Sequence, residues 1–203
     1  MTATGASLAR PCPAGRYPDG PLPVRGGEAG GVRVRPAEAA DRAALSAMFD
    51  RCTPSTRYRR FHGPVKAIPE RYLADALSGS PFHYALVACP EPVKDLNSGP
   101  GPDPGQRRVP GGGGIVALAS CRAVDEGAAE LGVLIEDAWQ RRGLGTRLIG
   151  DLAAHAANAG IRVLEAQLLA EQSWITGLLR PYGACRLRST WSGVLDVSVR
   201  LPA

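Results

Sequence analysis

Apolar residues recur three and four positions apart in five stretches of the chain, which is the spacing of one face of an α-helix. The longest stretch covers residues 144–159 and places Leu148, Leu152 and Ala156 on one side. Gly160 follows it, and glycine commonly ends helices because it adopts the left-handed conformation of the C-terminal cap. Helices are therefore predicted over residues 41–50, 54–61, 70–77, 144–159 and 172–179.

Shorter runs rich in Val, Leu, Ile and Ala lie between these helices and are typical of β-strands. Two of them flank the turn 125–127, which ends in a glycine, so they are predicted to form a hairpin. Because helices and strands intermix without an internal repeat, we expect one α+β domain around a mixed sheet. The predicted strands are 32–35, 84–89, 115–122, 129–135, 163–169, 186–190 and 195–201.

Two segments rich in proline and glycine, residues 1–31 and 90–113, lack this periodicity. Such segments bury too little apolar surface to offset the entropy of ordering. Residues 1–31 are predicted to be a disordered tail, and residues 90–113 a flexible insertion within a hairpin. A role for the insertion as an active-site lid stays open. The folded domain is thus expected over residues 32–203.

The overall composition excludes several classes of protein. Apolar residues make up 44% of the chain, an ordinary share for a globular domain. No run approaches the ~20 apolar residues of a membrane-spanning helix, and the N-terminus lacks the pattern of a signal peptide. The five cysteines are widely spaced without a Cys-x-x-Cys pair, which favours reduced thiols over disulfides or a zinc site. We expect a cytoplasmic protein with neither a membrane partner nor a bound metal.

The formal net charge is +5, and the basic residues are 22 arginines and two lysines. This excess suits an anionic cofactor or a nucleic acid, but a coding bias toward arginine explains it equally well. Basic and aromatic residues do not interleave as in RNA-binding proteins, so no nucleic-acid partner is expected. Arg57, Arg59 and Arg60 cluster beside Tyr58. A solvated helix face is the simpler interpretation of this cluster, and a role near a substrate stays open.

The most informative segment is residues 140–146, where a predicted strand leads through a glycine-bearing turn into the longest helix. Backbone N–H groups at a helix N-terminus are unpaired and partly positive, so they attract phosphate. Gly143 and Gly145 carry no side chain that would block a close approach. The guanidinium groups that add positive charge nearby are those of Arg141, Arg142 and Arg147.

Two common phosphate-binding loops do not fit this turn. The Walker pattern requires a lysine directly before Thr146, and Gly145 stands there. The dinucleotide-binding fingerprint requires a third glycine where Leu148 stands. A turn that needs small residues only to start a helix remains the alternative without a ligand.

The string Gln140-Arg141-Arg142-Gly143-Leu144-Gly145 resembles the Gln/Arg-x-x-Gly-x-Gly/Ala signature with which GNAT (Gcn5-related) N-acetyltransferases bind pyrophosphate. The resemblance extends over about residues 32–190. Residues 129–135 resemble the family's fourth strand, and residues 169–173 with Gly183 resemble the segment beside the CoA thiol. Residues 53–61 are similar to the second helix of the bacterial protein-lysine acetyltransferase branch. This resemblance implies the GNAT acyl-CoA N-acyltransferase fold, a mixed, mostly antiparallel sheet flanked by helices.

The resemblance also implies acetyl-CoA as the acyl-donor cosubstrate. The acceptor would be a small-molecule amine or a protein lysine, and the chain a monomer or a homodimer. Gln172 stands where the family often has an asparagine that contacts pantetheine, and a backbone N–H near Leu134 would meet the oxyanion. The residues expected to bind the cofactor are Val133, Leu134, Ile135, Gln140, Arg141, Arg142, Gly143, Leu144, Gly145, Thr146 and Gln172.

Acetyl transfer to an amine requires a base, because an alkylamine is mostly protonated at neutral pH. Glu130 is the candidate: it lies in an apolar strand, where burial would make its carboxylate more basic, and family members often use a glutamate there. The alternative is that Glu130 points outward from a half-exposed strand. The family's usual acid, a tyrosine, is replaced by Leu179, with Tyr182 close by in the sequence. A non-catalytic acyl-CoA-binding regulatory or sensor domain is therefore the alternative function.

Overall fold

The computed structural model describes residues 31–91, 114–189 and 193–202. The predicted tail (1–31) and insertion (90–113) lie outside these ranges, apart from their boundary residues. Both therefore remain predictions.

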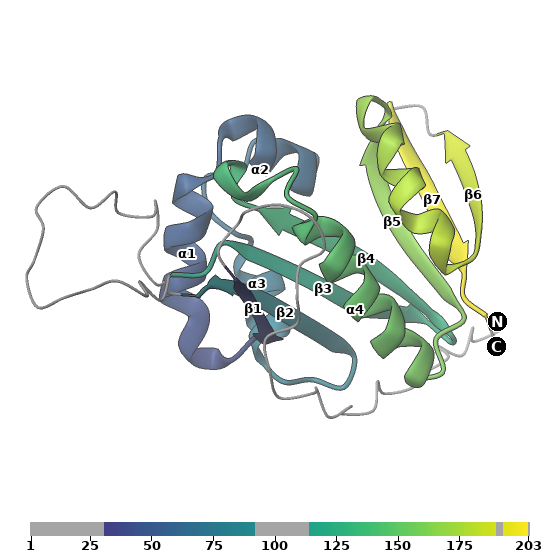
Figure 1. Ribbon diagram of the computed structural model, residues 1–203, viewed down its shortest axis with the longest axis horizontal. Helices are drawn as coiled ribbons and strands as arrows, with labels where there is room; N and C mark the ends of the chain where they lie inside the picture. Colours follow the sequence, from purple (N-terminus) through teal and green to yellow (C-terminus); the bar gives the residue numbers. More distant parts are fainter. Residues whose placement is uncertain (1–30, 92–113, 190–192, 203) are drawn as a thin grey trace, which may run out of the picture.

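The described residues contain a single sheet of seven strands in the order β1-β2-β3-β4-β5-β7-β6 (Figure 1). Neighbouring strands are antiparallel except for β4 and β5, which confirms the predicted mixed, mostly antiparallel sheet. The strands are β1 (Val32–Pro36), β2 (His83–Pro90), β3 (Ala117–Asp125), β4 (Ala128–Ile135), β5 (Val163–Leu169), β6 (Ala184–Ser189) and β7 (Val194–Arg200).

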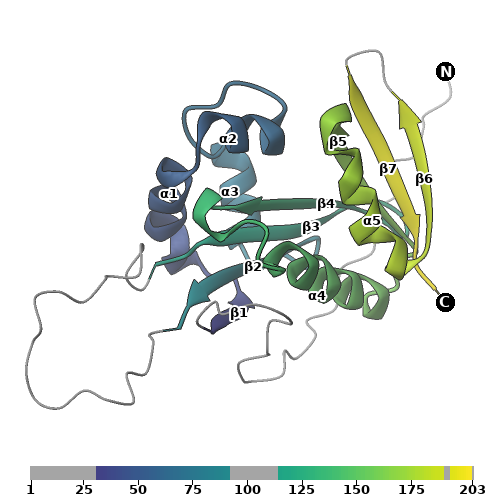
Figure 2. The same ribbon diagram turned by 45° about the horizontal axis from the view of Figure 1, so that its top comes forward.

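Helices cover both faces of the sheet (Figures 1 and 2). The helices α1 (Arg42–Arg51), α2 (Pro54–Phe61) and α3 (Glu70–Leu77) lie on one face, and α4 (Leu144–Asn158) and α5 (Thr176–Leu179) lie on the other. None of the described helices is both long and apolar enough to cross a membrane. Short 3₁₀ turns connect them: η1 (Ala39–Asp41), η2 (Asp137–Trp139), η3 (Ala170–Ile175) and η4 (Arg180–Tyr182).

One helix differs from its prediction. Residues 172–179, expected as a single helix, form the end of η3 followed by the single turn of α5. Gly177 lowers the helix propensity of this stretch, and Pro181 cannot continue the ladder of helical hydrogen bonds beyond it. The sequence pattern located the segment correctly but missed its irregular geometry.

Two apolar clusters, one on each face, hold the helices to the sheet. Leu148 and Leu152 of α4 are fully buried against one face, and Phe49 of α1 is buried against the other. Burying a side chain of this size stabilises the fold by about 1.5–3 kcal/mol. The strand β4 contributes to both clusters, so it is fixed from both sides.

The sheet opens between β4 and β5. These two strands pair only between residues 128–130 and 163–165. Beyond that point β4 continues along β3, while β5 continues along β7, and the two strands diverge (Figure 1). The wedge between them positions the candidate site.

Candidate functional site

A cavity of about 930 Å³, here called the large cavity, occupies the wedge between β4 and β5. Residues 131–135 of β4 and 166–168 of β5 line it, together with parts of α2, α4 and η3. Because residues 131–135 have lost β5 as a neighbour, alternate peptide groups of this stretch face the cavity. An extended ligand that carries amide groups can pair with them as an added strand would.

The N-terminus of α4 forms one end of the large cavity. The first bond within the helix runs from the Arg147 N–H to the Gly143 carbonyl, at 3.1 Å, so the three preceding amides lie free of the helical ladder. Arg141 and Gly143 both adopt left-handed backbone conformations, with φ values of 59° and 80°. Turns of this kind form concave rows of N–H groups that bind anions.

The two glycines of the turn serve different purposes. Gly143 adopts a positive φ that other residues rarely accept, so the backbone itself requires it. Gly145 has no such conformation, and a Cβ added there would meet only the Ile135 Cδ1 at 3.5 Å, an ordinary contact. The fold therefore does not require glycine at position 145. The absence of a side chain there instead keeps the approach to the cavity open.

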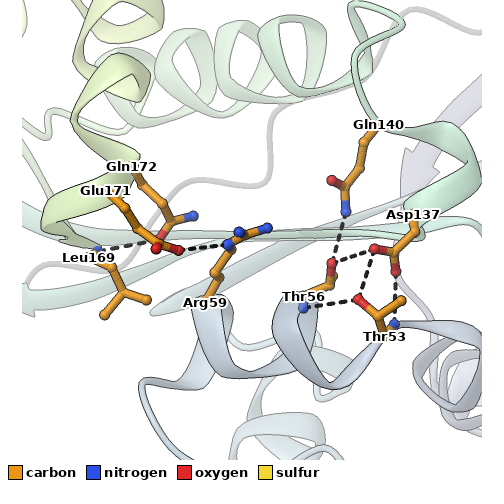
Figure 3. A network of polar contacts seen from close by, with 8 residues as sticks. All are labelled: Thr53, Thr56, Arg59, Asp137, Gln140, Leu169, Glu171 and Gln172. Carbon is orange, nitrogen blue, oxygen red and sulfur yellow. Dashed lines mark hydrogen bonds and ion pairs between the residues drawn. The ribbon is translucent and has the colours of Figure 1, made fainter.

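Polar contacts with the start of α2 and with η2 hold the glycine turn in place (Figure 3). The Gln140 side-chain amide donates to the Ile135 carbonyl at 2.9 Å and to the Thr56 hydroxyl at 3.1 Å. That hydroxyl donates to Asp137 at 2.8 Å, and Asp137 also accepts bonds from the Thr53 backbone N–H (2.8 Å) and hydroxyl (2.9 Å). The Gln140 side chain therefore positions the turn. The sequence did not indicate Thr56 or Asp137.

Asp137 remains ionised within this network. Partial burial opposes the charge, but the hydrogen bonds from Thr53 and Thr56 prevail and lower the pKa of Asp137 below its ordinary value. A charged acceptor strengthens the bonds that it receives. The carboxylate thus ties α2 firmly to the start of the glycine turn.

The remaining predicted cofactor residues fall into two groups. Gln172 lines the large cavity and accepts a bond from the Leu169 N–H at 3.2 Å. Two residues do not line the cavity: Leu144 is buried in the core, and the guanidinium of Arg142 lies over the Trp139 ring. The predicted residues that the structure brings together along the cavity are Val133, Leu134, Ile135, Gln140, Arg141, Gly143, Gly145, Thr146 and Gln172.

The side chains considered as a general acid lie in different places. Leu179 is buried and forms part of the cavity wall. The Tyr182 hydroxyl lies 3.5 Å from the Thr146 carbonyl, next to Gly150, and its residue does not line the cavity. Burial raises the pKa of Tyr182 above its ordinary value.

Arg147, expected to add free positive charge at the glycine turn, is instead paired with Asp151 at 2.7 Å.

Glu130 lies in a more polar environment than its apolar strand suggests. Its carboxylate pairs with Arg122 of β3, and 39% of its side chain is exposed. The two residues are direct partners in the β3–β4 register. The sequence contained a signal for this pair, because the predicted hairpin around residues 125–127 brings residues 122 and 130 opposite each other.

A second cavity of about 290 Å³, the small cavity, adjoins the first. The two cavities share Arg60, Phe61, Glu130 and Gly132, so Glu130 stands at their junction. Three polar side chains cross the sheet in register at the small cavity, since His83 of β2 faces Arg122 of β3, which faces Glu130 of β4. The other residues that line the small cavity are Pro69, Arg71, Tyr72, Asp75 and Ser120.

One further ion pair links the two sides of the wedge. Arg59 of α2 donates to Glu171 of η3 at 3.0 Å, and both residues line the large cavity (Figure 3). Both side chains are largely exposed, so the pair adds little stability. Arg57 and Arg60 belong to the same predicted cluster but have other contacts: Arg57 lies over the Phe49 ring, and Arg60 contacts Gly132.

Comparisons with known proteins agree with this geometry. Residues 99–174 match the family model described as the acetyltransferase (GNAT) family. This span includes β4, the glycine turn and α4, the elements that build the large cavity. Over this span the chain is similar to the GNAT family. GNAT enzymes transfer an acyl group from acyl-CoA to amine or lysine acceptors, so the match indicates an acyltransferase.

Solved structures share the fold. The GNAT domain of S. lividans PAT has a TM-score of 0.65 and 20% sequence identity, over 92% of this chain and 100% of that domain. A GCN5-related N-acetyltransferase from Kribbella flavida has a TM-score of 0.58 and 16% identity, over 84% of this chain and 98% of its own. A cAMP-binding acyltransferase from Mycobacterium smegmatis has a TM-score of 0.54 and 21% identity.

The match to the mycobacterial protein includes 90% of this chain but only 47% of that protein. At such identities the likeness establishes the fold and not the substrate. No curated protein sequence matches the chain.

Proposed function

We propose that this GNAT protein is an N-acetyltransferase that moves an acetyl group from acetyl-CoA to a primary amine by direct attack. One observation carries the proposal: two cavities meet at Glu130, and the larger of them ends at the free amides of the α4 N-terminus. The large cavity suits a long, anionic, amide-bearing donor, and the junction supplies a carboxylate where donor and acceptor would meet.

The donor would lie along β4. Its phosphates would bind the backbone N–H groups of residues 143–146, with charge added by Arg141 and Arg142. Its pantetheine amides would pair with residues 133–135, within reach of Gln172. The thioester would then point toward Glu130, with its oxyanion near the Leu134 backbone. The wedge in the sheet supports this arrangement, because it leaves these peptide groups without a neighbouring strand.

Glu130 would act as the general base through a water molecule. An alkylamine with a pKa near ~10.4 must lose a proton before it attacks the thioester carbon. The partial exposure of the Glu130 side chain supports a relay through water, and the ion pair with Arg122 would hold the carboxylate in place. A thiol with a pKa near ~8.5 leaves readily as thiolate, so Leu179 in place of a tyrosine acid is compatible with turnover.

A non-catalytic acyl-CoA-binding sensor is the second candidate, and one observation favours it: no tyrosine hydroxyl of the described residues lines the large cavity. As for location, the described cysteines Cys52, Cys89, Cys121 and Cys185 form no disulfide bonds, which supports the prediction of a reducing, cytoplasmic compartment.

An acceptor panel distinguishes the two candidates. The chain is incubated with acetyl-CoA and small amines, amino acids and lysine peptides, and the release of free CoA thiol is followed. We expect at least one acceptor to raise thiol release well above hydrolysis, with one N-acetylated product per thiol. Tight binding of acetyl-CoA without transfer to any acceptor would instead identify the sensor.

A further inference from the structure

The small cavity contains a guanidinium group that forms no ion pair with any residue that the structure describes. The Arg60 guanidinium carbon lies 5.0 Å from the centre of the Phe61 ring and 4.9 Å from that of Tyr72. Among the described residues, no carboxylate lies within ion-pair distance of Arg60. A partly buried cation that stacks on two rings is held in one place and keeps its donors free for a ligand.

Gly132 of β4 provides the space for this cation. A Cβ at Gly132 would collide with the guanidinium nitrogens of Arg60. The backbone of Gly132 does not have a positive φ, so the strand conformation does not require glycine there. The absence of a side chain at Gly132 therefore serves the position of Arg60.

His83 gives a second, independent indication of a ligand. Only 3% of His83 is exposed, and neither ring nitrogen has a hydrogen-bond partner in the part of the chain that the structure describes. Burial, followed by the charge of Arg122, lowers the pKa of His83 to about 4, so the ring is neutral at pH 7. The other charges around it are Asp75, Arg60 and Glu130. A neutral imidazole has one donor and one acceptor, and both are buried in the wall of the small cavity without a partner among the described residues.

The charges around the small cavity suit a ligand with an anionic group. Arg60, Arg71 and Arg122 line it against only Asp75 and Glu130, which leaves one positive charge in excess. Arg122 is paired with Glu130, whereas Arg60, at the junction of the two cavities, has no ion-pair partner among the described residues.

The spacing also fits a short zwitterion. Glu130 and Gly132 lie two residues apart on one face of β4, about 6.8 Å along the strand. An acceptor whose amine faces the carboxylate of Glu130 would therefore direct a nearby carboxylate toward the guanidinium over Gly132. A volume of about 290 Å³ corresponds to roughly ten water molecules at ~30 Å³ each, enough for a molecule of that size.

We propose that the small cavity is the acceptor subsite and that the acceptor is a small primary amine that bears a carboxylate, such as a free amino acid. The proposal rests on the proposed acetyl transfer. Arg60 binds the carboxylate, the neutral His83 ring forms part of the wall, and the amine faces Glu130. The amine nitrogen forms a bond to the acetyl carbon as the carbon–sulfur bond breaks; its proton passes to Glu130 through water, and CoA leaves as thiolate.

Paired acceptors test this inference. Initial rates are measured for amino acids and for the same amines with the carboxylate replaced by hydrogen, such as lysine against pentane-1,5-diamine. We expect the wild-type chain to prefer the carboxylated member in kcat/KM by roughly 10- to 100-fold, the value of a hydrogen bond between charged groups. A lysine peptide with blocked ends forms a third arm and should be a poor acceptor.

Variants of Arg60 test whether this residue causes the preference for carboxylated acceptors. Arg60→Met keeps an apolar side chain against the rings and should remove the preference by raising KM for carboxylated amines alone. Arg60→Lys should restore part of it, and Arg186→Met, on exposed β6, is the matched control. Gly132→Ala displaces the guanidinium without deleting it and should cause the same selective loss, so the test holds even if Arg60→Met fails to fold.

Several outcomes would overturn the inference. Equal rates for both members of a pair, a preference for the blocked peptide, or equal losses for both members in Arg60→Met would each exclude carboxylate recognition by Arg60. Weaker acetyl-CoA binding in Arg60→Met, measured by thermal shift, would assign the residue to the donor. Acetyl-CoA binding with transfer to uncharged amines would contradict the acceptor class alone, whereas no acetyl-CoA binding at all would overturn the proposed function with it.

Discussion

The two cavities that meet at Glu130 are built in different ways. The large cavity uses peptide groups from one strand and one helix start, and its decisive residues follow one another between positions 131 and 146. The small cavity uses individual side chains from α2, α3, β2, β3 and β4, which span residues 60–132. A backbone site tolerates many side chains, whereas a side-chain site depends on each residue that forms it.

This difference predicts separable defects. Changes at the glycine turn should weaken donor binding and therefore lower activity toward every acceptor. Changes at the small cavity should alter the choice of acceptor and leave donor binding unchanged. Glu130, which belongs to both cavities, should affect the rate of the chemical step more than either affinity.

Glu130→Gln should have the largest effect. The variant keeps the shape of the side chain but cannot accept a proton, and loss of a general base typically reduces the rate by ~10²–10⁴-fold. Its remaining rate should rise with pH, as more acceptor is neutral without help. Steady-state kinetics between pH 6 and 9 with an acceptor from the panel measure this.

The matched control is Glu165→Gln, because Glu165 is the register partner of Glu130 on β5 and lines neither cavity. Parental rates for Glu130→Gln across that pH range, at an unchanged KM, would make Glu130 a structural residue paired with Arg122.

Gly145→Val should weaken acetyl-CoA binding by roughly 100-fold or more, the loss of two hydrogen bonds to a charged group at about 1.5–3 kcal/mol each. The fold should survive, because a Cβ at this position makes only an ordinary contact with Ile135. Calorimetric titration of the variant measures the affinity. In Gly177→Val the added Cβ meets no atom within 4 Å, so this control should bind like the parent. Parental affinity in a folded Gly145→Val would remove the turn from the donor site.

Asp137→Ala should destabilise the chain by about 1–3 kcal/mol, because three donors of Thr53 and Thr56 lose their acceptor. The pKa of Asp137 is lowered in the folded state, so its contribution is complete above the ordinary value of 3.8 and is lost as the pH falls through the lowered one. Urea unfolding at pH 7 and at pH 3 measures the difference. An equal destabilisation at both pH values would show that the charge of Asp137 is irrelevant.

His83→Phe should have the smallest effect, visible only in acid. The folded chain keeps His83 neutral down to a pKa of about 4, whereas the unfolded chain protonates it near the ordinary 6.5. The free energy of unfolding therefore does not depend on His83 titration above pH 6.5. It decreases as the pH falls from 6.5 to 4, because the unfolded chain takes up a proton that the folded chain does not. The wild-type melting temperature should fall more steeply across this window than that of His83→Phe. Parallel curves would indicate that His83 is not held neutral.

The same contrast explains what the sequence could predict. Residues 54–61, 70–77 and 163–169 form the predicted elements with the predicted bounds, since local periodicity and caps determine them. The glycine turn was visible because its chemistry lies within a few consecutive residues. The small cavity was not, because the approach of Arg60 to Gly132 and the burial of His83 depend on packing between distant elements. The Arg122–Glu130 pair was less visible than the glycine turn and more visible than the small cavity. It follows from the register of a predicted hairpin.

The most direct test is a thermal melt with acetyl-CoA, because the large cavity is the feature on which every other step depends. At ~100 times its Kd, acetyl-CoA should stabilise the chain by about 2.7 kcal/mol, which raises the melting temperature by roughly 5–10 °C for a chain of this length. NAD and ATP at the same concentration should do much less. A larger shift with NAD than with acetyl-CoA would contradict an acyl-CoA site between β4 and β5.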